Sequence, residues 1–171
     1  MNRLLFMLYL LLLIVGCDGG LSPAPPFRPG FGGTIYFAQG TWPSQDSVKG
    51  LWVFASEVYP IKADSVLVLY VAGKIQTYPA LNSSLPFYID SVAYDFGFEN
   101  SEKLPITFAY IGVLHWVQGE VFPIDTTKYH IVGDYHEINS IAPKKITVKE
   151  FQYTPGINIY VDFYNLPPQL F

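Results

Sequence analysis

The residue types best suited to chemistry lie close together between His130 and Glu137. Alternate residues of a β-strand share one face, so His130, Asp134 and His136 would project together. Imidazole and carboxylate groups are ligands that zinc accepts. Six extended residues span roughly 20 Å, however, so the two histidines could share one ion only if Gly133 bends the chain sharply. Asp134 and His136, about 7 Å apart, are therefore weak metal-ligand candidates, and a solvent-facing strand edge is the favoured interpretation.

Other residues that could act in catalysis do not form a catalytic pattern. The sequence has no phosphate-binding glycine loop, no Gly-x-Ser-x-Gly elbow, no His-Glu-x-x-His motif and no cysteine pair. His115 lies in an apolar stretch, which favours a packed, hydrogen-bonded histidine over a catalytic base. Glu99 and Glu102 lie in a polar, turn-rich stretch typical of a solvated loop. We therefore expect no enzymatic activity and no cofactor, with a metal-assisted hydrolase at the aspartate–histidine pair as the less favoured alternative.

Aromatic side chains, which make up 17% of the chain, are the second group that could bind a ligand. Exposed aromatic faces beside polar groups stack on sugars, whereas buried aromatic rings fill a core. Trp52 and Trp116 lie within predicted strands and are expected in the core. Trp42 lies in a loop, and Tyr160 and Tyr164 lie on the expected outer face of the last strand. These last three are the candidate ligand-binding residues, for carbohydrate or peptide.

The single cysteine, Cys17, ends an N-terminal segment of a different character. Residues 4–15 form an uninterrupted apolar run after Arg3. As a helix, this run would span roughly 18 Å, which is too short for the roughly 30 Å hydrocarbon core but suits the apolar region of a signal peptide. Its ending, Ile14-Val15-Gly16-Cys17, resembles the lipobox of bacterial lipoproteins. The resemblance implies cleavage before Cys17 and acylation of its sulfur.

Acylation at Cys17 would attach the mature chain to a membrane of the bacterial cell envelope, with the choice of inner or outer membrane left open. An ordinary secretory signal followed by a buried free cysteine, or a short membrane anchor, is the alternative. The net charge of −4 leaves no basic surplus to neutralise phosphates, so we expect no nucleic-acid partner. The expected partners are the membrane, another envelope protein or a glycan.

The composition divides the chain into three segments. Residues 1–16 are the expected signal helix, and residues 17–33 are the lipidated cysteine with a tether. Four prolines and five glycines between Asp18 and Gly33 disfavour both a helix and a strand ladder in this tether. Residues 34–171 are the expected globular domain.

Short runs of β-branched and aromatic residues, separated by Pro, Gly, Asn and Asp, predict strands in this domain. The predicted strands are 34–38, 51–57, 85–96 (one or two strands), 105–117, 130–135, 145–150 and 157–164. The stretch 105–117 is apolar on both faces and is expected to be a central strand bent near Gly112. Lysines alternate with aliphatic residues in 145–150, which is typical of an edge strand. Residues 65–72 fit either a strand or a short helix that Gly73 ends.

Seven or eight short strands predict an all-β fold, a mostly antiparallel β-sandwich. The opening Gly33-Thr34-Ile35 and the number of strands resemble the prealbumin-like sandwiches, which include carboxypeptidase regulatory-like and Cna-B-type domains; an Ig-like arrangement is the alternative. The ending Asn165-Leu166-Pro167-Pro168 resembles lipoproteins of Bacteroidota-like bacteria. These resemblances imply a non-catalytic accessory module. The sequence therefore predicts a lipid-anchored envelope protein with a structural, accessory or ligand-binding role.

Overall fold

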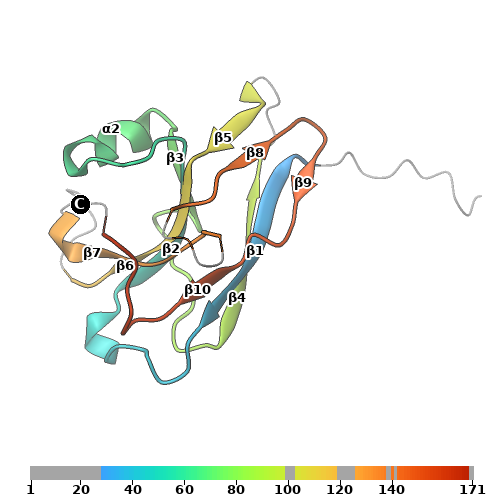
Figure 1. Ribbon diagram of the computed structural model, residues 1–171. Helices are drawn as coiled ribbons and strands as arrows, with labels where there is room; N and C mark the ends of the chain where they lie inside the picture. The colour runs from blue at the N-terminus through green and yellow to red at the C-terminus, as the bar shows by residue number, and fades with distance from the viewer. Residues whose placement is uncertain (1–27, 99–102, 119–125, 138–139, 141, 170–171) are drawn as a thin grey trace, which may run out of the picture.

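A computed structural model describes residues 28–98, 103–118, 126–137, 140 and 142–169. They form two four-stranded sheets and one two-stranded sheet, which together make an all-β sandwich, as predicted (Figure 1). The relation to prealbumin-like or Ig-like sandwiches stays a prediction. The expected signal peptide, Cys17 and the tether up to residue 27 lie outside the described residues. Within the described part of the chain, no helix has the length and apolar character needed to cross a membrane.

The first sheet is built around β1 (Gly30–Phe37). Along one side, β1 pairs antiparallel with β4 (Ser91–Gly97). Along the other side, it pairs parallel with β9 (Tyr153–Thr154) and β10 (Ile159–Val161). The first described strand therefore lies between a neighbour from the middle of the chain and two neighbours from near its end.

β1 begins at Gly30, four residues before the strand expected from Thr34 and inside the expected tether. Phe31 is fully buried in the core, which requires this part of the chain to be ordered against the sandwich. At Gly33, an added Cβ would collide with the backbone carbonyl of Ile157. Glycine is therefore needed where β1 passes close to the segment that leads into β10. The expected boundary at residue 33 was wrong because the glycines serve close strand packing.

The second sheet is antiparallel throughout, in the order β3-β2-β6-β7. Its strands are β2 (Gly50–Ser56), β3 (Ile75–Tyr78), β6 (Tyr110–Trp116) and β7 (Tyr129–Asp134). As predicted, β6 is a central strand covered on both faces. Ile111 and Val113 lie in the main core between the sheets, whereas Tyr110 lies in a second apolar cluster on the opposite face.

The third sheet pairs β5 (Ile106–Phe108) with β8 (Ile146–Val148). β5 and β6 together replace the single strand expected over 105–117, so this expectation was wrong. The chain changes sheets at Ala109, whose backbone N–H donates to the carbonyl of Ser56, and not near Gly112. Among the described strands, β8 pairs only with β5, and it alternates buried and exposed residues, as expected of an edge strand.

The ambiguous segment 65–72 is helical. A 3₁₀ turn, η2 (Ala63–Ser65), leads into the helix α2 (Val66–Val71). Gly73 ends the helix with a φ of 69°, and its N–H donates to the carbonyl of Tyr70 at 2.9 Å. The next N–H, of Lys74, donates to Leu69 at 2.8 Å, which completes a Schellman motif. Two further 3₁₀ turns are η1 (Gln45–Ser47) and η4 (Thr126–Lys128).

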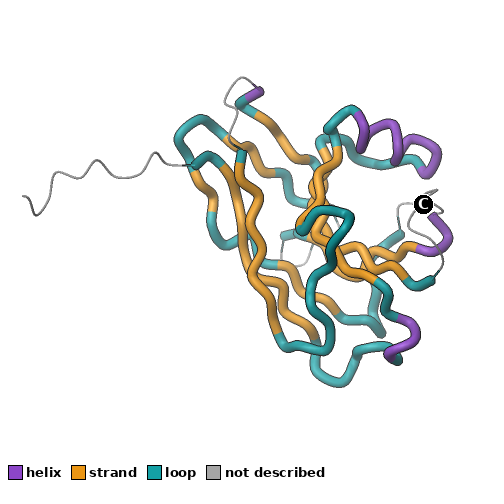
Figure 2. Tube along the Cα trace, turned by 180° about the vertical axis from the view of Figure 1, so that it is seen from behind, coloured by secondary structure: helices purple, strands orange, loops and turns teal. Residues whose placement is uncertain are grey.

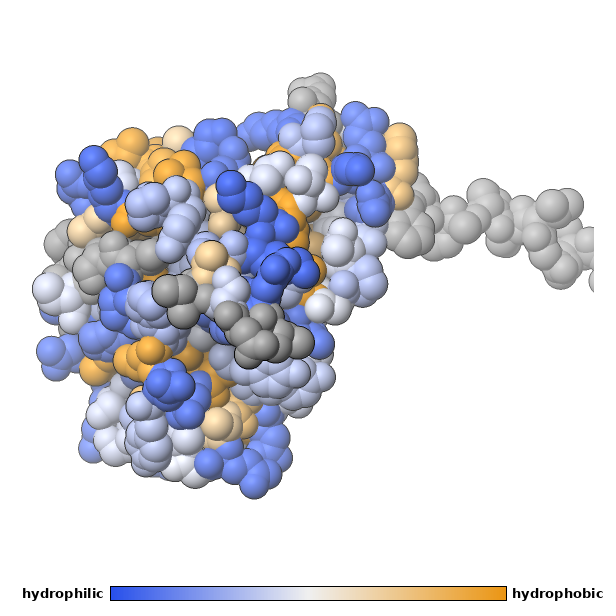
Figure 3. All heavy atoms as spheres, viewed as in Figure 1, coloured by the Kyte–Doolittle hydropathy of each residue, from blue (hydrophilic) through white to orange (hydrophobic). Residues whose placement is uncertain are grey.

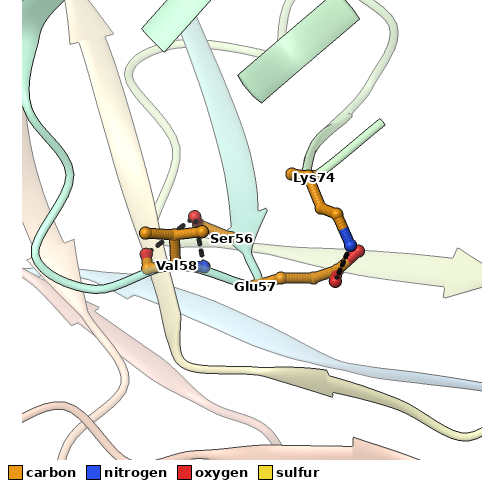
Figure 4. Close-up of polar contacts among 4 residues, drawn as sticks. All are labelled: Ser56, Glu57, Val58 and Lys74. Carbon is orange, nitrogen blue, oxygen red and sulfur yellow. Dashed lines mark hydrogen bonds and ion pairs between the residues drawn. The ribbon is translucent and has the colours of Figure 1, made fainter. Parts of the chain in front are cut away.

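Polar contacts fix the turn that follows β2 and join it to the residue that follows α2 (Figure 4). The hydroxyl of Ser56 is fully buried, donates to the carbonyl of Val58 at 2.8 Å and accepts the N–H of Val58 at 3.1 Å. Lys74, which follows the helix, forms an ion pair with Glu57 at 2.6 Å. The second apolar cluster lies between α2 and the second sheet, so α2 covers the face of that sheet that is turned away from the first sheet (Figure 2).

Candidate functional site

The edges of the two large sheets meet where β7 passes β10. At Gly133, an added Cβ would lie 2.6 Å from the backbone oxygen of Tyr160, so only a glycine allows this approach. A cavity of about 490 Å³ opens beside this contact. We call it the β7–β10 cavity; the ends of β1 and β7, the strand β10 and residues 165–168 line it. The cavity is therefore assembled from segments that are distant in the sequence.

The C-terminal wall of the β7–β10 cavity is fixed to the outer edge of β7 by Gln169. Its amide oxygen accepts the N–H of Ile131 at 2.8 Å, and its amide nitrogen donates to the carbonyl of the same residue at 2.9 Å. The side chain thus completes the backbone bonding of Ile131, as a neighbouring strand would. The wall is held by specific hydrogen bonds as well as by packing.

Asp134 and His136, the predicted weak metal-ligand pair, both line the β7–β10 cavity. Asp134 is only 8% exposed, and its Oδ1 accepts a hydrogen bond from Nδ1 of His136 at 2.9 Å. With its proton on Nδ1, the neutral imidazole presents Nε2 as an acceptor. The pair of Asp134 and His136 is therefore a carboxylate-oriented histidine beside an open cavity. Asp134 also affects Tyr110 of β6: burial raises the pKa of Tyr110 above its ordinary range, and the nearby charge of Asp134 adds to this shift.

The structure separates His130 from this pair. A β-bulge shifts the register of β6 and β7, so that Val113 faces Gly133 whereas Leu114 faces Ile131. The extra residue, Val132, reverses the alternation of faces beyond it, so the expectation that His130, Asp134 and His136 share one face was wrong. His130 pairs with His115 in the register and does not line the cavity. No group of three or more His, Cys, Asp or Glu among the described residues could hold a metal ion.

Tyr160 projects from the outer face of β10 and is 72% exposed, as predicted. The parallel register places it beside Tyr36 of β1, and the two rings stack with centroids 5.3 Å apart. Both tyrosines line the β7–β10 cavity. Tyr164 is also highly exposed but does not line it. Sequence reasoning missed Tyr36 as a partner, although its alternation with buried Ile35 and Phe37 placed it on the outer face.

Trp42, the remaining aromatic candidate, packs against other rings and is only half-exposed. Its ring centroid lies 4.6 Å from that of Phe37, 4.9 Å from that of Phe163 and 5.1 Å from that of Tyr88. Trp42 does not line the β7–β10 cavity. Of the three predicted aromatic residues, the structure therefore brings only Tyr160 to the cavity.

His115 is buried and hydrogen-bonded, as predicted. Its Nε2 lies 2.9 Å from the carbonyl oxygen of Ser47 and must donate to it, because the carbonyl can only accept. Burial lowers the pKa of His115, and the hydrogen bond to Ser47 opposes this only in part. Trp52 is buried as expected, and its ring N–H donates to the carbonyl of Ser83 at 2.6 Å. Trp116 is half-buried at the end of β6.

A second, more open hollow of about 480 Å³ lies over the outer face of the first sheet. We call it the β1 hollow; its lining includes residues 32–34 of β1, together with Tyr153 and Asp95. The hydroxyl of Tyr153 donates to Asp95 at 2.8 Å, and Arg28 lies 3.7 Å from the same carboxylate. Burial and the hydrogen bond to Asp95 raise the pKa of Tyr153 to about 12. Tyr36 lines this hollow as well as the β7–β10 cavity.

Exposed apolar side chains also gather on α2, where Leu67, Val68 and Val71 face away from the second apolar cluster. In Figure 3, apolar atoms appear at the upper left, where Figure 1 places α2. β1 begins on the opposite side of the molecule (Figure 1). The apolar surface of α2 is therefore remote from the point at which the chain enters the sandwich.

No protein-family model, curated protein or solved structure matches this chain.

Proposed function

We propose that this chain is a non-catalytic, lipid-anchored protein of the bacterial cell envelope whose β-sandwich has a ligand-binding role. The observation that carries the binding role is the stacked pair Tyr36 and Tyr160 at the β7–β10 cavity. The volume of the β7–β10 cavity, about 490 Å³, lies within the range of small-molecule sites. A structural or accessory role in an envelope complex is the broader form of the same proposal.

The anchor is proposed from the N-terminal sequence alone. A basic residue, an apolar run of signal-peptide length and the ending Ile14-Val15-Gly16-Cys17 support it. A single acyl chain holds a protein only marginally, whereas two or three chains make attachment durable. Residues 18–27 then separate the anchor from the first described residues of the sandwich.

A binding role is favoured over catalysis by the way Asp134 and His136 are used. Each is the other's side-chain hydrogen-bond partner in the described structure, and no described nucleophile is hydrogen-bonded to His136. A metal-assisted hydrolase is the less favoured alternative, because no third His, Cys, Asp or Glu joins the pair as a ligand among the described residues. A carbohydrate- or peptide-binding module is the more specific form of the proposal.

The anchor is tested by Cys17→Ser. This variant should lose acyl labelling and leave the membrane fraction, because serine offers no thiol for lipid attachment. Asp18→Asn is the matched control, since it changes the adjacent residue and keeps the cysteine, and it should retain both acyl label and membrane association. Continued acyl labelling of Cys17→Ser would overturn the lipoprotein assignment.

The binding role is tested by retention on immobilised envelope material. Tyr160→Ala should reduce retention, whereas Tyr164→Ala should not, because Tyr164 is similarly exposed but lies outside the cavity. Far-ultraviolet circular dichroism of both variants verifies that the sandwich is intact. Equal retention of the two variants and the parent protein would contradict a binding role for the cavity.

A further inference from the structure

Building on the proposed binding role, we propose that the β7–β10 cavity and the β1 hollow form one continuous trough that binds a linear, uncharged glycan. Tyr36 connects the two, because it lines both. Their volumes are about 490 and 480 Å³, and each is large enough for a small ligand by itself. A compact ligand would fill one of them, whereas an elongated ligand that crosses Tyr36 would fill both.

The floor of the trough is made of small residues. On the outer face of β1, Gly32 and Thr34 precede Tyr36, and Ala93 of β4 lies opposite Thr34 in the register. Tyr153 rises beside this floor at one end, where its hydroxyl lies over Gly32, and the stacked pair of Tyr36 with Tyr160 rises at the other end. Tyr78 and Tyr94 also line the β1 hollow. The face therefore offers a low path that leads to an aromatic platform.

The backbone beneath the trough is not available to a peptide. β1 is paired with β4 on one side and with β9 and β10 on the other. In the gap between β9 and β10, the carbonyl of Gly32 accepts the N–H of Ile157 at 3.1 Å. The N–H of Thr34 donates to the side-chain oxygen of Asn158 at 3.0 Å. Strand addition requires a free strand edge, which β1, the strand beneath the trough, does not present.

The trough presents side chains in place of free backbone groups, and these side chains suit sugar rings. The exposed ring of Tyr160 can stack on the apolar face of a pyranose. Asp134 and Asp162, which line the β7–β10 cavity, can accept hydrogen bonds from sugar hydroxyls. A flat aromatic face beside carboxylate acceptors is thus matched by a ligand that is apolar on one face and rich in hydroxyl donors at its rim.

The charge of the trough argues against an acidic glycan. Asp134, Asp162 and Asp95 line it, and no lysine or arginine does so among the lining residues that the structure describes. Arg28 touches the trough only through its ion pair with Asp95. A uronate would bring its carboxylate beside these aspartates, where His136 is already hydrogen-bonded to Asp134 and Arg28 is already paired with Asp95, so like-charge repulsion disfavours it.

The test uses the full protein purified from membranes in detergent, titrated calorimetrically with β-1,4-glucan, β-1,4-mannan and α-1,4-glucan oligomers of two to six sugars. At least one series should bind with an affinity that rises with chain length. Galacturonate oligomers of the same lengths should bind more weakly. Tyr36→Ala and Tyr160→Ala should each weaken binding of the six-sugar probe about 3- to 10-fold. Ala93→Trp should weaken the six-sugar probe more than the two-sugar probe, because it raises the floor of the trough.

The outcomes separate this inference from the proposed function. Binding without length dependence, or unaffected by Ala93→Trp, would overturn the continuous trough. Tighter binding of the galacturonate series would overturn the charge argument. If none of these oligomers binds while retention on envelope material still depends on Tyr160, the glycan inference fails and the binding role stands. Equal loss of binding in Tyr164→Ala would refute the assignment of the aromatic platform.

Discussion

Phe31→Ala is the sharpest test of where the sandwich begins. The composition places Phe31 in a tether, whereas the structure buries it completely in β1. Its ring centroid lies 4.9 Å from that of Phe96, 5.4 Å from that of Phe108 and 6.4 Å from that of Phe98. The substitution would remove a ring from the middle of this aromatic cluster and leave a cavity.

The expected loss is large enough to measure without ambiguity. Truncating a buried phenylalanine to alanine costs about 3–5 kcal/mol of unfolding free energy, from lost transfer free energy and the remaining cavity. With a urea m-value of about 2 kcal/mol/M, the unfolding midpoint should fall by about 1.5–2.5 M. A tether residue would leave the midpoint unchanged.

The assay is urea unfolding followed by circular dichroism, in a Cys17→Ser background so that lipid makes no contribution. Phe151→Ala is the matched control, because the same side chain is removed from a position that is 76% exposed. It should change stability by no more than about 0.5 kcal/mol. If Phe31→Ala is as mild as Phe151→Ala, β1 does not begin at Gly30 and the reasoning from close glycine packing is refuted.

Two further substitutions test the interior. Burial holds the pKa of His115 below its ordinary value of 6.5, so the unfolded chain binds more protons at acid pH. The contribution of His115 to stability is therefore complete above about pH 6.5 and decreases as the pH falls through that value towards the folded-state pKa. His115→Gln should reduce the change in urea midpoint between pH 7.5 and 5.5. An unchanged pH dependence of the midpoint would contradict this. Gly133→Ala should cost about 1–3 kcal/mol, because its Cβ would press on the backbone of Tyr160. A melting temperature within error of the parent protein would show that β7 and β10 do not meet as described.

Local patterns predicted the strands whose residues alternate between apolar and polar or are continuously apolar. Tertiary contacts determined the other elements. The split of 105–117 at Ala109 leaves no local mark, because alanine is neither a turn residue nor a breaker. β3 was not predicted, since four residues at a sheet edge are too few to establish a period. The three glycines that open β1 resemble a linker until the close approach of neighbouring strands is known.

The candidate site was predictable residue by residue but not as an assembly. Asp134, His136 and Tyr160 carry recognisable chemistry, and all three line one cavity. Their proximity depends on the contact of β7 with β10 and on the bulge at Val132, neither of which has a periodic signature. Tyr36 joins them only through the parallel register of β1 and β10.

The position of β1 between early and late segments governs the order in which the domain can assemble. Thr34 bonds to Asn158, which follows it by 124 residues. Because the chain becomes available from its N-terminus onward, β1 can pair with β4 before residues 153–161 are present, so its other edge stays unpaired until these residues arrive. Contacts of such separation close slowly, because loop-closure entropy must be overcome first. Three of the first four residues of β1 are glycines, which have little tendency to form strands. The unpaired edge of β1 is therefore less able to pair with another chain.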